Sequence, residues 1–310
     1  VGLDDEEYEV FLEEELSSYD ALFRAIRSPT LPAALALYYG RICVLPKPVY
    51  LMRNLPLRIT LGQMGSFDTR LREAVLSRLD TPPHLPDTAI FTFHQPTGQG
   101  GMGYVESKTT TAAARWACLA LGATEVQELA DSGLETPLIL DRIETFRALV
   151  GAGVSRTEEV HQDCKPGDDE WELLPHSPAL INSHYLGADG QSLRQLQKML
   201  TFEIQAAKRR EFFECCSNDD YTRLKSCALK GASDWLTDVD AALCMSDHDV
   251  AVAANLRLGL APTTAPLPSL CPLCKRVMAN NHHLYCRTLL RKTINGHDRS
   301  QNEIGRASCR

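Results

Sequence analysis

Apolar residues recur at every third or fourth position over most of this chain, which is the spacing of amphipathic helices. The stretch 59–79 shows it most clearly, through Met64, Phe67, Leu71 and Val75. Prolines and glycine-rich turns interrupt the pattern and indicate where helices end. We predict helices at residues 4–27, 32–43, 59–79, 109–121, 138–150, 192–216, 219–229 and 249–258, and a short strand-like run at 90–93. The fold class that follows is mainly α.

The helical periodicity stops between residues 151 and 190, where Pro, Gly, Asp and His replace it. Such a composition is typical of a linker or a long surface loop. Helices are predicted again after this break, and Asp219 can cap the one at 219–229. The chain therefore divides into a helical region at 1–150, the linker at 151–190, a helical connector at 191–262 and a small module at 263–300.

Length and cysteine usage favour an intracellular protein of about two domains. No apolar run approaches the ~20 residues of a membrane span. The acidic N-terminal stretch lacks the basic and apolar segments of a secretion signal. The eleven cysteines are an odd number and are scattered, which indicates reduced thiols with one metal cluster and not a disulfide framework. We expect a nuclear or cytoplasmic protein that is neither secreted nor in a membrane.

Two cysteines and a later histidine–cysteine pair form the motif C-x2-C-x7-H-x3-C. The cysteines can form a tight knuckle, and the pair, four residues apart, would share one face of a helix. Four such ligands suit a tetrahedral, structural zinc ion with no position left for water. The predicted ligands are Cys271, Cys274, His282 and Cys286. His283 could replace His282, His297 is a further candidate, and four unconnected residues are the alternative.

Charge is distributed unevenly along a chain whose net charge is −8. The first twenty residues hold nine acids and no base, whereas residues 271–310 hold eight Lys or Arg against two acids. This polarity fits a basic C-terminal module that contacts phosphates. A solvated charged surface is the alternative, and for the acidic segment alone we prefer it.

No motif of the chain predicts a catalytic centre. The run Gly98-x-Gly100-x-x-Gly103 matches the dinucleotide-binding fingerprint, but Pro96 interrupts its approach and no α/β alternation surrounds it. We interpret it as a structural turn. The acidic pairs at 4–5, 168–169 and 219–220 lack the hairpin between apolar strands in which polymerases hold two metal ions. We expect no small-molecule substrate.

A series of short motifs resembles, in the same order, the region that follows the polymerase core in reverse transcriptases of non-LTR retrotransposons. The residues 45–56, LPKPVYLMRNLP, resemble that family's LP-x-x-x-Y-L-L-R-x-x-P segment, and 96–103, PTGQGGMG, resembles its P-x-x-x-G-G-L-G turn. The further motifs in family order are Gly231–Leu236, Leu256–Leu260, the cysteine–histidine set and His297-Asp298.

The resemblance implies a fragment of a polyprotein that would be an RNA-directed DNA polymerase with an endonuclease. Residues 1–150 would be thumb-like, 191–262 a connector and 263–300 a zinc-knuckle-like module. The family's catalytic Asp-Asp hairpin would lie before Val1 and its nuclease carboxylates after Arg310, so this chain would carry neither activity. Residues 303–310 resemble a translated sequencing adapter, so we expect that tail to be foreign to the protein.

The partners implied by the resemblance are an RNA or DNA template–primer or target DNA, held by phosphate contacts that position without reading sequence. The candidate contacts are Arg41, Lys47 and Arg53 in the thumb-like region, and Lys275, Arg276, Arg287, Arg291 and Lys292 in the zinc module. Two other functions stay open. One is a host zinc-binding helical module for protein interactions, and the other is a nucleotide-dependent enzyme that uses the glycine turn.

Overall fold

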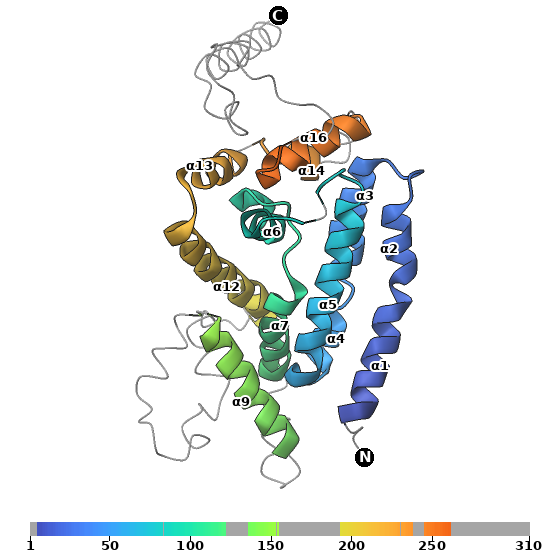
Figure 1. Ribbon diagram of the computed structural model, residues 1–310. Helices are drawn as coiled ribbons and strands as arrows, with labels where there is room; N and C mark the ends of the chain where they lie inside the picture. Colours follow the sequence, from blue (N-terminus) through green and yellow to red (C-terminus); the bar gives the residue numbers. More distant parts are fainter. Residues whose placement is uncertain are drawn as a thin grey trace, which may run out of the picture. The chain divides into compact units, whose positions relative to one another are not determined.

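The computed structural model of the chain describes residues 5–82, 84–121, 136–152, 154, 193–229, 231–237 and 245–261. Within these ranges the secondary structure is helical and contains no strand, which confirms the mainly α fold class (Figure 1). The predicted zinc module at 263–300 and the tail at 303–310 lie outside these ranges, as does nearly all of the predicted linker. None of the described helices is long and apolar enough to cross a membrane.

The chain forms two compact units that alternate along the sequence. The first comprises Val1–Leu31, Ala36–Val75 and Tyr104–Cys215, and the second comprises Pro32–Leu35, Leu76–Gly103 and Cys216–Arg310. The helix at the start of the predicted connector therefore belongs to the first unit, with the helices of the predicted thumb-like region. Buried apolar side chains are present in both units.

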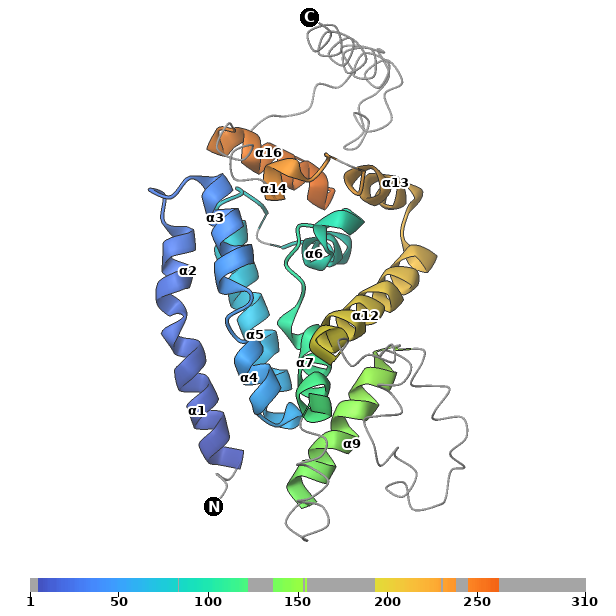
Figure 2. The same cartoon turned by 180° about the vertical axis from the view of Figure 1, so that it is seen from behind.

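The first unit is built around α7 (Ser107–Leu121), which packs against α4 (Val49–Asn54), α9 (Thr136–Gly151) and α12 (Leu193–Cys215). Figures 1 and 2, from opposite sides, both place α7 between α4 and α12. The other helices of this unit are α1 (Asp5–Ser18), α2 (Asp20–Arg27), α3 (Ala33–Tyr39), the π-helical turn η1 (Gly40–Val44) and α5 (Leu57–Leu76). Helix α3 begins in the second unit.

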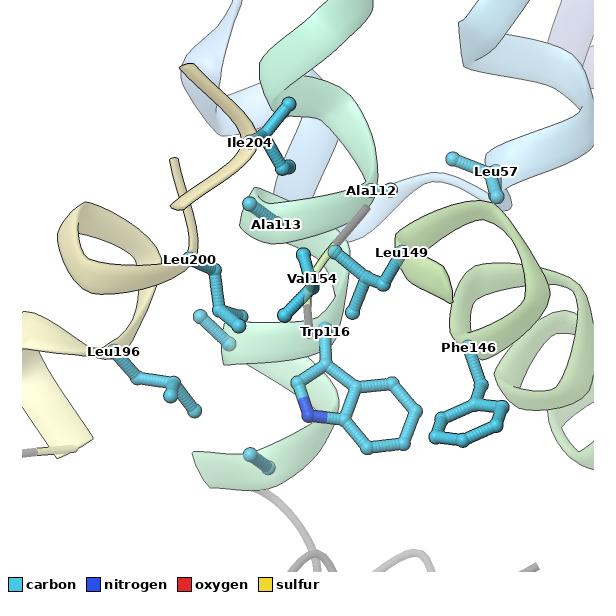
Figure 3. Close-up of a cluster of buried hydrophobic side chains, with 12 residues drawn as sticks. Leu57, Ala112, Ala113, Trp116, Phe146, Leu149, Val154, Leu196, Leu200 and Ile204 are labelled. Atoms are coloured by element: carbon cyan, nitrogen blue, oxygen red, sulfur yellow. The ribbon is translucent and has the colours of Figure 1, made fainter. Parts of the chain in front are cut away.

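Alanines on α7 let its neighbours approach closely, and large side chains of those neighbours fill the space between them. Trp116 of α7 lies against Phe146 of α9, with 5.9 Å between the ring centroids (Figure 3). Leu196, Leu200 and Ile204, one stripe of α12, complete this core. Burying such side chains is the main favourable contribution to folding, at about 25 cal/mol per Å² of apolar surface.

The second unit consists of α6 (Asp87–His94), η2 (Thr97–Gln99), α13 (Asn218–Cys227), α14 (Asp234–Thr237) and α16 (Asp247–Leu258). Helix α6 packs on α16, and α13 packs on η2 and α16. The predicted strand-like run at 90–93 was wrong, because it lies inside α6. Pro86 precedes this helix, and Ala89 and Phe93, four residues apart, bury one face of it.

Three details of the predicted helices were also wrong. The stretch 4–27 forms two helices that meet at Tyr19, and the helix predicted at 32–43 changes to the π-helical turn at Gly40. The cap of α13 is Ser217 and not Asp219: the Ser217 Oγ accepts the backbone N–H of Asp220 at 3.1 Å. Asp219 instead places its negative charge in the first turn, where the helix dipole favours it.

Candidate nucleic-acid interface

An open cavity of about 390 Å³ lies in the first unit, between η1, α4, the start of α7 and α12. This volume is within the range of protein sites for small ligands. Its apolar wall is formed by Leu45, Pro46, Val49, Met52 and Val105. Its polar, uncharged groups are Ser107, Thr110, Gln197 and Thr201. An apolar wall with a few polar groups suits a ligand that is itself partly apolar.

Three cationic side chains line this cavity: Arg41, Arg53 and Lys198. Among the described residues that line it, none is acidic. The Arg41 guanidinium lies 5.9 Å from the ring centroid of Tyr38. Burial lowers the pKa of Arg41 below the usual value for arginine, but a guanidinium keeps its proton in proteins. The cavity therefore gathers positive charge in a molecule that is acidic as a whole.

Arg53 is held in place from both its side chain and its backbone. Its Nε and Nη2 both donate to the Oε1 of Gln197, the former at 2.9 Å, and so connect α4 to α12. Its carbonyl accepts a hydrogen bond from the Nη1 of Arg115 at 2.7 Å. Arg115 in turn forms a buried ion pair with Asp141, with Nε and Oδ2 2.6 Å apart. The position of Arg53 is therefore fixed by a network that reaches the core.

A buried carboxylate supports the start of α7, whose first turn lines the cavity. Asp68 of α5 accepts the backbone N–H groups of Ser107 and Lys108 at 2.8 and 2.9 Å. Burial raises the pKa of Asp68 to about 6, although these two hydrogen bonds act in the opposite direction. A second nearby carboxylate, that of Glu106, pairs with the Lys208 Nζ at 2.7 Å. Both acids are thus committed to interactions within the protein.

Two of the three nucleic-acid contacts predicted in the thumb-like region lie at the same cavity. Arg41 and Arg53 both line the cavity, while Lys47 is exposed in the turn after Leu45 and Pro46, without lining it. Lys198 was not predicted. Its sequence signal is weak, because a lysine on the polar face of a long helix is ordinary.

The remaining predicted site residues lie outside the described residues. These are the zinc ligands Cys271, Cys274, His282 and Cys286 and the basic residues Lys275, Arg276, Arg287, Arg291 and Lys292. Within the described ranges, no group of three or more His, Cys, Asp or Glu is placed to hold a metal ion. The zinc ion stays a prediction.

The glycine turn of the second unit is packed against protein on two sides. Gly100 has φ +93°, and a Cβ built on it would lie 2.2 Å from the carbonyl oxygen of Leu224. A Cβ on Gly101 would lie 2.1 Å from the carbonyl oxygen of Gln95. Glycine is needed here for close packing of backbone on backbone. The geometry favours our interpretation of a structural turn.

Arg257 joins three of the motifs that are far apart in the sequence. Its Nε donates to the carbonyl of Gly101 at 3.0 Å, and its Nη2 to that of Thr97 at 3.2 Å. It also donates to the carbonyl of Ala232 at 3.0 Å and to the Oγ of Ser233 at 2.7 Å. One guanidinium therefore holds the glycine turn, the residues before α14 and the end of α16 together.

Comparisons with known proteins give no match at any level. The sequence matches no family model and no curated protein, and the fold matches no solved structure. Functional assignment therefore depends on the geometry above.

Proposed function

We propose that this chain is a non-catalytic, nucleic-acid-contacting region of a retroelement reverse transcriptase polyprotein, with the first unit as its thumb-like part. Its role is to hold an RNA or DNA template–primer, or target DNA, by phosphate contacts. Such contacts fix register and orientation and carry no sequence information. A zinc ion on Cys271, Cys274, His282 and Cys286 would stabilise the C-terminal module, because metal binding contributes directly to the folding free energy of small modules.

The observation that carries this proposal is the charge of the cavity. Arg41, Arg53 and Lys198 converge there from η1, α4 and α12, without an acid among the described lining residues. Three like charges grouped in one cavity repel one another, so the cluster itself does not stabilise the fold. Such a cluster does suit a polyanion, because each neutralised phosphate releases counterions.

The test is the affinity of the full chain for a labelled RNA–DNA hybrid, measured by fluorescence anisotropy. We expect the variant Arg41→Gln/Arg53→Gln/Lys198→Gln to bind roughly tenfold or more weakly at moderate salt. The matched control is Arg24→Gln/Arg27→Gln/Arg210→Gln, which removes three exposed cations of the same unit from outside the cavity. Equal losses in the two variants would contradict a localised interface.

The retroelement origin has a separate test in the source locus. A long sequencing read should find, in the same reading frame upstream of Val1, an aromatic-x-Asp-Asp hairpin between apolar strands. Absence of such a frame would contradict the polyprotein assignment. Salt-independent binding to a protein partner, without nucleic-acid binding, would instead support a zinc-binding helical interaction module.

A further inference from the structure

Two aromatic side chains of the first unit are largely exposed to solvent. Tyr50 of α4 is 72% exposed and Phe202 of α12 is 63% exposed. They are the two most exposed large hydrophobic side chains among the described residues of this unit. Single exposed apolar residues are common on protein surfaces, so their meaning depends on what lies beside them.

Both aromatic residues lie beside a cation of the cavity. Tyr50 precedes Arg53 by three residues on α4, and Phe202 follows Lys198 by four on α12, so each pair shares a helix face. The neighbours Val49 and Thr201 line the cavity themselves. The hydrogen bonds from Arg53 to Gln197 connect the two helices at this point. The two aromatic residues do not line the cavity themselves, but each shares a helix face with one of its cations and so lies next to its rim.

We propose that this site binds unpaired nucleotides, whose bases stack on Tyr50 and Phe202 while Arg53, Lys198 and Arg41 contact the adjacent phosphates. The inference rests on the proposed function and adds to it that the unpaired nucleotides of the nucleic-acid ligand are held at this site. Alternating aromatic and cationic side chains are the usual means of holding a single strand without reading its sequence.

The exposure of the base faces distinguishes a single strand from a duplex as the ligand of these rings. In a duplex the faces of the bases are covered by their neighbours, so an exposed aromatic ring gains little from contact with it. In a single strand every base presents a π-face, and stacking on an aromatic ring is favourable for all four bases. The apolar wall of Leu45, Val49 and Met52 adds contact for a base or sugar. A protein partner for the rings alone would leave the three cations without a role.

The experiment compares one short single-stranded oligonucleotide with its hybrid duplex, using the full chain. We expect Tyr50→Ala/Phe202→Ala to weaken single-strand binding by roughly tenfold or more per ring, with duplex affinity unchanged. Tyr50→Phe/Phe202→Tyr keeps both rings and should bind like wild type. Phe11→Ala is the matched control, because Phe11 is an exposed aromatic residue of α1, a helix that carries none of the cavity's cations. Both rings are exposed, so the variants should keep the helical circular dichroism of the wild type.

A second measurement uses an oligonucleotide that contains 2-aminopurine, whose fluorescence is quenched when the base stacks. Wild type should quench it and the double alanine variant should not. Wild-type binding with no loss in the alanine variant, or with equal loss on single strand and duplex, would overturn the stacking inference and leave the proposed function standing. Absence of wild-type binding to either nucleic acid would overturn both.

Discussion

Buried charged side chains hold helix ends in both units: mainly arginines in the second unit, and carboxylates together with Arg115, which donates to the carbonyl of Arg53 near the end of α4, in the first. In the first unit, buried carboxylates accept backbone N–H groups at helix starts: Asp68 at α7, and Asp141 at Leu57, the first residue of α5, at 2.7 Å. In the second unit, buried arginines donate to carbonyls at helix ends, as Arg257 does to Cys227 at the end of α13. Each sign matches the partial charge of the helix terminus that it meets.

This difference decides which arginines are left for a ligand. Arg223 and Arg257 of the second unit are buried, and apart from the Nε of Arg223 their nitrogens donate to carbonyls, hydroxyls and Asp220 inside the unit. In the first unit, Arg53 is exposed and donates only to Gln197 among the described residues. An arginine in a sequence motif is therefore a binding residue or a structural one according to how its five donors are used.

The largest effect that we predict concerns Arg257. Arg257→Met should lower the free energy of unfolding by about 3–5 kcal/mol, because it leaves several buried carbonyls without a donor. Urea denaturation followed by circular dichroism measures this. The exposed Arg210→Met on α12 is the control, and it should change stability by less than about 0.5 kcal/mol. Comparable losses in the two variants would show that Arg257 is not the centre of the second unit.

A smaller, pH-dependent effect is expected from Asp68 in the first unit. Because burial raises its pKa from 3.8 to about 6, the native state binds the proton more tightly than the unfolded state does. The contribution of Asp68 to stability should therefore fall as pH rises from about 4 to about 6, by up to ~3 kcal/mol in total.

The measurement is the difference in unfolding free energy between wild type and Asp68→Asn across this pH range. Asparagine does not titrate, so the difference isolates the carboxyl group from the other acids of the chain. The variant should also lose about 1 kcal/mol at all pH values, because one of the two N–H groups at the start of α7 loses its acceptor. A difference that is constant with pH would contradict the raised pKa.

The smallest effect on stability is expected at the cavity itself. Arg53→Met removes only an exposed side chain and its hydrogen bonds to Gln197, so the unfolding free energy should change by less than about 1 kcal/mol. Nucleic-acid binding should nevertheless weaken evenly across sequences, with the salt slope smaller by about one. Large destabilisation without change in the salt slope would place Arg53 with the structural arginines.

The long helices and their buried faces could be predicted from the sequence because their apolar spacing extends over several turns. The stripe of Leu196, Leu200 and Ile204 on α12 is an example, and it is buried as the spacing indicates. Helix α6 could not be predicted, since eight residues give too few periods to distinguish a helix from a strand. Its character depends on packing against α16.

The cavity could be predicted only in part, because its residues come from separate elements. Arg41 and Arg53 stood near or within one motif, but Lys198 joins them through the packing of α7 with α12. Phe202 carried a signal in the sequence, since a large apolar residue lies outside the buried stripe of its own helix. Arg257 lies within the motif Leu256–Leu260, but its buried role could not be predicted, because burial of an arginine depends on carbonyls supplied by distant turns.

The central claim is that positive charge at the cavity of the first unit contacts nucleic-acid phosphates. The most direct measurement is the slope of log affinity against log salt concentration for wild type and for Arg41→Gln/Arg53→Gln/Lys198→Gln. We predict that the triple variant has a slope smaller by about three, one for each lost phosphate contact. Parallel slopes for the two proteins would contradict the account, because the three cations would then not contact the phosphates.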